Sequence, residues 1–138
     1  KLRQKALHLL QEEAELNEIV QLVGVDSLSF TDRLKLETAK SIREDYLHQN
    51  AFHDVDTYSS LNKQFKLLKL ILGFYKEGLE GIHKGASFAK VAAIPQREEI
   101  GRFKYIEEEQ IDERYEKLMN DIRAAINALV VEEAEADD

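Results

Sequence analysis

The chain has 138 residues, with 19 Lys or Arg against 27 Asp or Glu and a formal net charge of −8. The length fits one domain, and a hydrophobic fraction of 43% is too high for a disordered chain. Because the sequence has no Cys, it excludes disulfides, thiolate metal sites and cysteine nucleophiles. The acidic balance argues against a nucleic-acid partner, since binding to phosphates needs an excess of Lys and Arg. No apolar run approaches the roughly 20 residues that span a bilayer, so we expect no membrane insertion.

Helical periodicity begins at the start of the chain. Apolar residues recur on one face from Leu2 to Val23, and Gly24 follows where a left-handed C-cap is expected. A capping box at residues 29–32 predicts a second helix that ends near His48. This helix is expected to bury four residues, Leu36, Ala39, Ile42 and Tyr46.

The third expected helix, capped by Ser59 or Ser60, carries a heptad seam. Its apolar residues step alternately by four and three positions, a pattern typical of helices that pack on other helices. The seam could bind a partner helix, but packing in the domain core is the favoured interpretation. Leu67, Ile71 and Phe74 widen the seam to a broad buried face, so we expect this helix to be central in the fold. The seam comprises Leu61, Phe65, Leu68, Leu72, Tyr75, Leu79 and Ile82.

Three glycines lie within the same helix, at Gly73, Gly78 and Gly81. Each lowers helix propensity by about 1 kcal/mol relative to Ala. We expect them to permit close helix contacts, or else to allow the far end of the helix to fray.

The rest of the chain predicts two short helices and one long one. Ser87 is expected to cap a helix that Pro95 terminates, and residues 97–103 form another short candidate. The long helix is expected over residues 107–132, followed by a disordered acidic tail over residues 132–138. The prediction is an all-α fold, an irregular bundle of about four to six helices, with the domain over residues 1–131.

Motifs for chemistry are missing from the sequence. No phosphate-binding glycine loop and no nucleophile elbow occurs, and the acidic pairs are typical of solvated helix faces, so no catalytic residue is assigned. His48, His53, Asp54 and Asp56 are metal-ligand types, but their spacing fits no standard zinc or calcium site. Loop capping and hydrogen bonding explain them better, so no metal ligand is assigned.

Phe52 is the most informative residue of this polar segment. An aromatic side chain there either fills the domain core or stacks on a planar group. Spacing alone favours the core position.

Three segments together resemble a known family. They are EEAELNEIVQLVGVDSL (residues 12–28), REDYLHQNAFHDVDTY (residues 43–58) and IPQREEIGRFKYI (residues 94–106). In this order they resemble the C-terminal helical domain of the catalytic A subunit of the archaeal/vacuolar-type (A/V-type) rotary ATPase, or ATP synthase. The resemblance covers nearly the whole chain, and the middle segment is its most specific part.

The resemblance implies a proton- or sodium-translocating machine. Three A subunits alternate with three B subunits around central stalk subunits, peripheral to the membrane on its cytoplasmic side. ATP or ADP with Mg²⁺ is bound by the full subunit, whose phosphate-binding parts lie upstream. The start at Lys1 without Met then indicates a piece of a longer chain, which by itself should hold no cofactor and hydrolyse no ATP. The alternative is a stand-alone helical protein-interaction module.

The resemblance also implies two roles for particular segments. The family's N-A-F motif lines the adenine end of the nucleotide site, which maps onto Ala51 and Phe52, with Gln49 retained nearby and His48 standing where Gln is common. This reverses the interpretation of Phe52 as a core residue. The family's helical domain also contacts the central stalk, and turns near residues 24–29 or 80–87 are candidates. Gln96 departs from the family pattern, where an apolar residue is common, which puts the local packing in doubt.

Overall fold

The computed structural model describes residues 1–47 and 60–136. The described residues contain helices and no strand, which confirms the predicted all-α class. The helices are α1 (Leu2–Val23), α2 (Phe30–Ser41), α4 (Leu61–His83), α5 (Phe88–Ala92), α6 (Gln96–Gly101) and α7 (Ile111–Ala136). Single 3₁₀ turns occur at η1 (Val25–Ser27), η3 (Phe103–Tyr105) and η4 (Glu108–Gln110), and η2 (Ile42–Leu47) is a π-helix.

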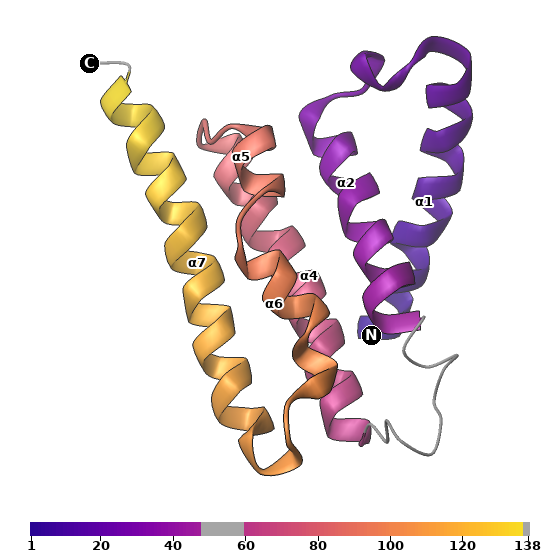
Figure 1. The fold of residues 1–138 in the computed structure, drawn as a ribbon. Helices are drawn as coiled ribbons and strands as arrows, with labels where there is room; N and C mark the ends of the chain where they lie inside the picture. The colour runs from indigo at the N-terminus through magenta and orange to yellow at the C-terminus, as the bar shows by residue number, and fades with distance from the viewer. Residues whose placement is uncertain (48–59, 137–138) are drawn as a thin grey trace.

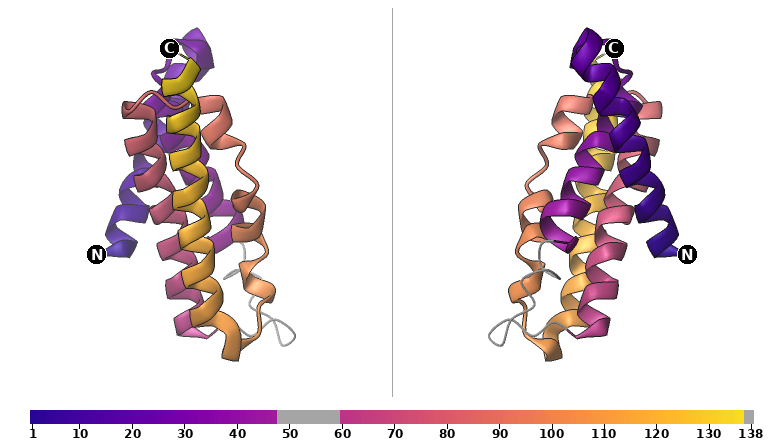
Figure 2. Two further views of the ribbon diagram at one scale, coloured as in Figure 1. Left: turned by 90° about the vertical axis from the view of Figure 1, so that its left-hand side faces the viewer. Right: turned by 90° about the vertical axis from the view of Figure 1, so that its right-hand side faces the viewer.

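Helix α4 is the centre of the bundle, as predicted. It packs between α7 on one side and α2 on the other, and α1 lies outside α2 (Figure 1). The short helices α5 and α6 run along one edge and contact α2, α4 and α7 (Figure 2). The largest buried side chains of this core are Leu34, Ile42, Leu67, Leu70, Ile71, Phe74, Phe103, Ile111 and Ile122.

Most of the apolar face predicted for α4 is buried, but the start of the heptad seam is exposed. Leu67, Leu70, Ile71 and Phe74 are fully buried, whereas Leu61 at the start of the seam is 80% exposed. Phe65 is 50% exposed, so core packing is the wrong interpretation for the first two seam positions. The other seam residues belong to the core or pack against it: Leu68 and Leu72 are buried, and Tyr75, Leu79 and Ile82 are partly buried.

The glycines of α4 serve close helix contacts, one of their two expected uses. A Cβ on Gly81 would lie 2.6 Å from Ile126 Cγ2 of α7, and a Cβ on Gly78 would lie 3.2 Å from Leu34 and Val91. A Cβ on Gly73 would meet the end of the Met119 side chain. The helix remains continuous to His83 rather than fraying.

The turn from α1 to α2 follows the sequence prediction with one difference. Gly24 ends α1 with φ 88° and ψ 159°, a positive-φ extended conformation rather than the left-handed helical one, and its N–H donates to Val20 O at 2.8 Å. Ser29 caps α2, accepting a hydrogen bond from the Asp32 N–H at 3.2 Å. In α2, Leu34 is fully buried while the predicted core residue Leu36 is half-buried.

Each of the helices α5, α6 and α7 has at least one boundary that differs from the predicted one. Ser87 caps α5 as predicted, but Pro95 stands at the N-cap of α6 rather than at the end of α5. Helix α7 continues through Ala136, so most of the acidic segment expected as a tail forms the last turns of this helix. No helix among the described residues combines the length and the hydrophobicity needed to cross a bilayer.

Candidate functional site

The residues assigned to adenine binding, Gln49, Ala51 and Phe52, lie outside the described residues. The same is true of the set considered for metal binding, His48, His53, Asp54 and Asp56. Within residues 1–47 and 60–136, no group of three His, Asp or Glu side chains could hold a metal ion. What the structure describes is the framework on both sides of residues 48–59.

On the N-terminal side, α2 passes into the π-helix η2, which leads directly to His48. π-helices are rare and are frequent at functional sites. Arg43 of η2 forms a two-pronged ion pair with Glu13 of α1, with Nε at 3.0 Å from Oε1 and Nη2 at 2.8 Å from Oε2. The Glu13 hydrogen bond raises the pKa of Arg43. The pair ties the π-helix to α1 and fixes its orientation.

Arg97 of α6 holds the end of α2 from the opposite side. Its guanidinium donates to Glu37 Oε1 at 2.7 Å, to the Glu37 carbonyl at 3.1 Å and to Ser41 Oγ at 3.3 Å. It also donates to the Ala92 carbonyl at 3.0 Å and lies 5.1 Å from the centre of the Phe74 ring. One planar cation therefore connects α2, α4, α5 and α6.

Asp45, within the π-helix, is a partly buried carboxyl group near this network. Burial raises the pKa of Asp45, and the neighbouring Glu44 raises it further. The increase in the pKa is opposed by the positive charge of Lys104, by a hydrogen bond from Ser41 and by the positive charge of Arg97. The π-helix thus places a carboxyl group in surroundings that disfavour its charge.

On the C-terminal side, Ser60 anchors the start of α4. Its Oγ accepts a hydrogen bond from the Lys63 N–H at 3.0 Å and donates to Glu108 Oε2 at 2.8 Å. The buried Lys63 side chain donates to the Lys104 carbonyl at 3.0 Å. Both ends of residues 48–59 are thus attached to well-connected elements, α2 with η2 and α4 with η4.

A second candidate surface lies at the other end of the bundle, where α1 turns into α2. Exposed apolar side chains gather there at Leu22, Val23, Val25 and Phe30, of which Leu22 is the most exposed at 85%. The Phe30 ring stacks on Phe88 of α5 with centroids 6.0 Å apart. Figure 1 shows the α1–α2 turn, the α4–α5 turn and the C-terminal end of α7 at this same end of the molecule.

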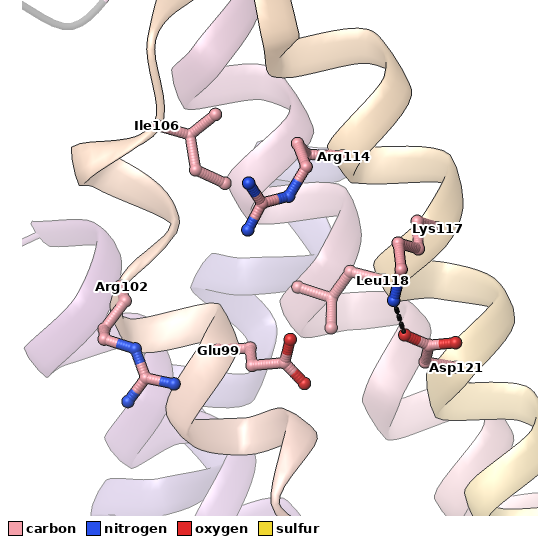
Figure 3. Close-up of a pocket in the computed structure, with 7 residues that line it drawn as sticks. All are labelled: Glu99, Arg102, Ile106, Arg114, Lys117, Leu118 and Asp121. Atoms are coloured by element: carbon pink, nitrogen blue, oxygen red, sulfur yellow. Dashed lines mark hydrogen bonds and ion pairs between the residues drawn. The ribbon is translucent and has the colours of Figure 1, made fainter.

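A small pocket of about 160 Å³ separates α6 from α7 (Figure 3). Arg114, Arg102 and Lys117 surround it, together with Glu99 and Asp121. Lys117 is paired with Asp121 at 2.9 Å. With both signs of charge at its mouth and no catalytic pair of side chains, the pocket does not identify an active site.

The matches to known proteins connect this framework to a family. Residues 1–92 match the family model described as the C-terminal domain of V and A type ATP synthase. The chain belongs to this family. It is 54% identical over 134 residues to the V-type ATP synthase alpha chain of Acetivibrio thermocellus, a match that covers 97% of this chain and 23% of that relative. It is 52% identical over 129 residues to the protein of the same name from Thermoanaerobacter pseudethanolicus, covering 94% of this chain and 22% of that relative.

A similar relative occurs in Clostridium botulinum. Its V-type ATP synthase alpha chain is 54% identical over 129 residues, which cover 94% of this chain and 22% of the relative. The chain thus spans about a quarter of the length of the curated relatives it matches. The family-model match includes α1 to α5, and the relatives extend the similarity beyond it. The resemblance inferred from three sequence segments is therefore confirmed.

Sequence reasoning missed the two arginine contacts of this family member. Both arginines lie in the segments that carry the family resemblance. Arg43 and Arg97 each directly precede two acidic residues. Their partners Glu13 and Glu37 lie 30 and 60 residues away in the chain. No spacing rule relates residues so far apart, so only the tertiary structure identifies the pairs.

Proposed function

We propose that this domain acts as the C-terminal part of the catalytic subunit of a rotary ATPase or ATP synthase. In this role it completes the adenine end of the nucleotide site and transmits nucleotide-driven closure to the central stalk. The observation that carries the proposal is the 54% identity, over 97% of the chain, to a V-type ATP synthase alpha chain. The alternative of a stand-alone interaction module has weaker support, because the relatives reported above all bear the ATP synthase name.

The proposed nucleotide contact is made by Phe52, which stacks on the adenine, with Ala51 and Gln49 beside it. ATP or ADP with Mg²⁺ would be held mainly by the rest of the full subunit. Stacking of a base on an aromatic ring contributes about 1–3 kcal/mol. The contact would therefore adjust nucleotide affinity without being able to hold ATP alone.

The arrangement of the helices supports a mechanical role. Residues 48–59 connect the ends of η2 and α4 that lie away from the α1–α2 turn (Figure 1). Helices α2 and α4 run between these two ends and pack closely on one another. A displacement at the nucleotide end would thus reach the exposed apolar residues of the α1–α2 turn as a rigid-body movement. We propose that this turn contacts the central stalk, in a ring where three such subunits alternate with three B subunits at the cytoplasmic side of the membrane.

The nucleotide role is tested by Phe52→Ala in the full-length subunit. We expect nucleotide affinity to fall by about 5- to 150-fold, which corresponds to the loss of one stacked base. Tyr105→Ala removes an exposed aromatic ring from η3 and serves as the control, with unchanged affinity expected. Unchanged affinity in Phe52→Ala would refute the adenine contact.

The mechanical role is tested in the assembled enzyme by the double variant Leu22→Ser/Val25→Ser. Both side chains are exposed, so folding and nucleotide affinity should be preserved. We expect the number of ions transported per ATP hydrolysed to fall, because the proposed contact with the stalk is weakened. Full coupling in the variant would refute the assignment of the α1–α2 turn to the stalk.

A further inference from the structure

A long apolar groove runs between the first half of α1 and helix α4. It consists of two adjoining hollows of about 800 and 570 Å³, which share Lys1, Leu2 and Lys69 as lining residues. Figure 2 shows the first turns of α1 beside the middle of α4. Tyr46 of η2 lines one hollow, but Arg43 and Arg97 line neither, and no residue of the α1–α2 turn does.

The heptad seam of α4 forms one wall of this groove. Leu61, Phe65 and Leu68 line one hollow, and Leu72, Tyr75 and Leu79 line the other. With a rise of 1.5 Å per residue, this apolar stripe extends for about 27 Å along the helix. A stripe of that length, with residues at alternating spacings of three and four, matches a second helix better than a compact small molecule.

The rim of the groove is basic, although the chain as a whole has a net charge of −8. Five cationic side chains line it: Lys1, Arg3, Lys5, Lys69 and Lys76. The structure records no ion pair between any of them and another residue of the described ranges 1–47 and 60–136. Glu12 is the acidic lining residue, and it is already engaged by Lys35 at 2.6 Å and His8 at 2.9 Å.

We propose that this groove binds an amphipathic helix of a separate protein, with Asp and Glu flanking its apolar stripe. Apolar residues of the partner would fill the spaces along the α4 seam in the manner of knobs in holes. Its carboxylates would meet the cationic rim, which both steers the encounter and fixes the direction of the helix. The charge contrast between the rim and the rest of the chain is the observation that selects an acidic partner.

The test measures binding of two designed helical peptides of about three heptads to the 138-residue chain. Both carry Leu at the a and d positions; one has Glu and the other Lys at the e and g positions. We expect the Glu peptide to bind and its affinity to decrease with added salt, while the Lys peptide binds at least about tenfold more weakly, a difference of about 1.4 kcal/mol. Equal affinity for the two peptides, or no binding of the Glu peptide, would overturn the proposal.

Charge variants locate the binding surface. Lys5→Glu/Lys76→Glu should weaken binding of the Glu peptide by at least about tenfold. Lys40→Glu/Lys84→Glu changes the net charge equally at exposed positions that do not line the groove, and should alter affinity by no more than about twofold. Equal weakening by both pairs would show a general charge effect and would also overturn the proposal.

An apolar variant and the oligomeric state complete the test. Leu61→Ser/Phe65→Ser alters exposed seam residues, so the melting temperature should be preserved while peptide binding is lost. Retained binding in this folded variant would exclude the seam. A concentration-dependent dimer in sedimentation that Lys5→Glu/Lys76→Glu abolishes would assign the groove to a second copy of the chain, contrary to the proposal.

Discussion

Arg43 and Glu13 form a two-pronged contact between a π-helix and the first helix of the domain, with the shorter prong at 2.8 Å. Glu13 is only 8% exposed, which is unusual for a carboxylate, and Arg43 is the partner that compensates its burial. The contact restrains η2, which precedes the proposed adenine-binding residues. An ion pair between two residues 30 positions apart in the sequence therefore restrains the helix that leads into residues 48–59.

We expect Glu13→Gln to lower the free energy of unfolding by about 1 kcal/mol. The amide keeps the shape of the side chain but loses the charge-assisted second prong to Arg43, which is half exposed and so partly rehydrated. Urea denaturation measures the change. Glu15→Gln, at an exposed position of the same helix, should stay within about 0.5 kcal/mol of the parent. Equal effects of the two variants would contradict a specific role for the contact.

Replacement of Arg97 by Lys is expected to destabilise the domain by about 1–3 kcal/mol, although the charge is kept. Lys cannot reproduce the planar fork that reaches Glu37, Ser41 and the Ala92 carbonyl together. Thermal unfolding provides the measurement. Arg102→Lys is the control, because Arg102 makes one exposed contact with Glu98 at 3.8 Å. A loss no larger than that of the control would argue against the network.

Two glycines of α4 should respond oppositely to substitution by Ala. Both variants gain about 1 kcal/mol of helix propensity. In Gly81→Ala the new Cβ would lie 2.6 Å from the branched Ile126, and overpacking should cost about 1–3 kcal/mol. In Gly73→Ala it meets the flexible end of Met119, which can rotate away, so stability should be unchanged or higher. Chemical denaturation measures the stability of both variants. A Gly81→Ala variant more stable than the parent would refute the close contact.

Stability at neutral pH should increase in Asp45→Asn. Burial raises the pKa of Asp45 in the folded state above its ordinary value of 3.8, so the folded protein binds this proton more tightly than the unfolded chain. The charged carboxylate therefore lowers the free energy of unfolding. This loss begins as the pH rises through 3.8 and is complete above the folded-state pKa. The advantage of the variant should be present at pH 7 and vanish below about pH 3.8. A constant difference across this range would mean that the lost charge is not the cause.

Gln96→Leu should stabilise the domain by about 1 kcal/mol. The Gln96 Oε1 atom is buried and has no hydrogen-bond partner among the described residues, so its desolvation is uncompensated. Leu has a similar size and no polar atom to satisfy. Differential scanning calorimetry should show a higher melting temperature than for Gln11→Leu, which changes an exposed position. A lower melting temperature in Gln96→Leu would show that the amide makes a contact worth more than its burial costs.

Local sequence signals predicted several elements closely. The expected bounds of the first helix, 2–23, are those of α1, because periodicity and Gly24 both act within neighbouring turns. Ser29, Ser60 and Ser87 cap their helices for the same local reason. Helical backbone continues to Leu47, close to the expected end near His48, but periodicity does not distinguish the α-helix from the π-helix that replaces it after Ser41.

The candidate site was predictable only in part. The resemblance of the middle segment identified Phe52, Ala51 and Gln49, and these assignments stay predictions because the residues lie outside the described ranges. The partners of Arg43 and Arg97 and the groove along α4 could not be read from the sequence. They depend on which faces of separate helices meet, and no local pattern records that choice.

The helical class, the caps and the family of this protein follow from its amino-acid sequence, because they depend on residue type and on spacing within a few turns. Only the tertiary structure determines how far along α4 this apolar face is covered. The middle of this face is buried, including the seam residues Leu68 and Leu72, whereas Leu61 and Phe65 stay exposed and line a groove at the edge of the core. Periodicity shows that a face is apolar, but only the positions of the neighbouring helices determine whether that face is covered.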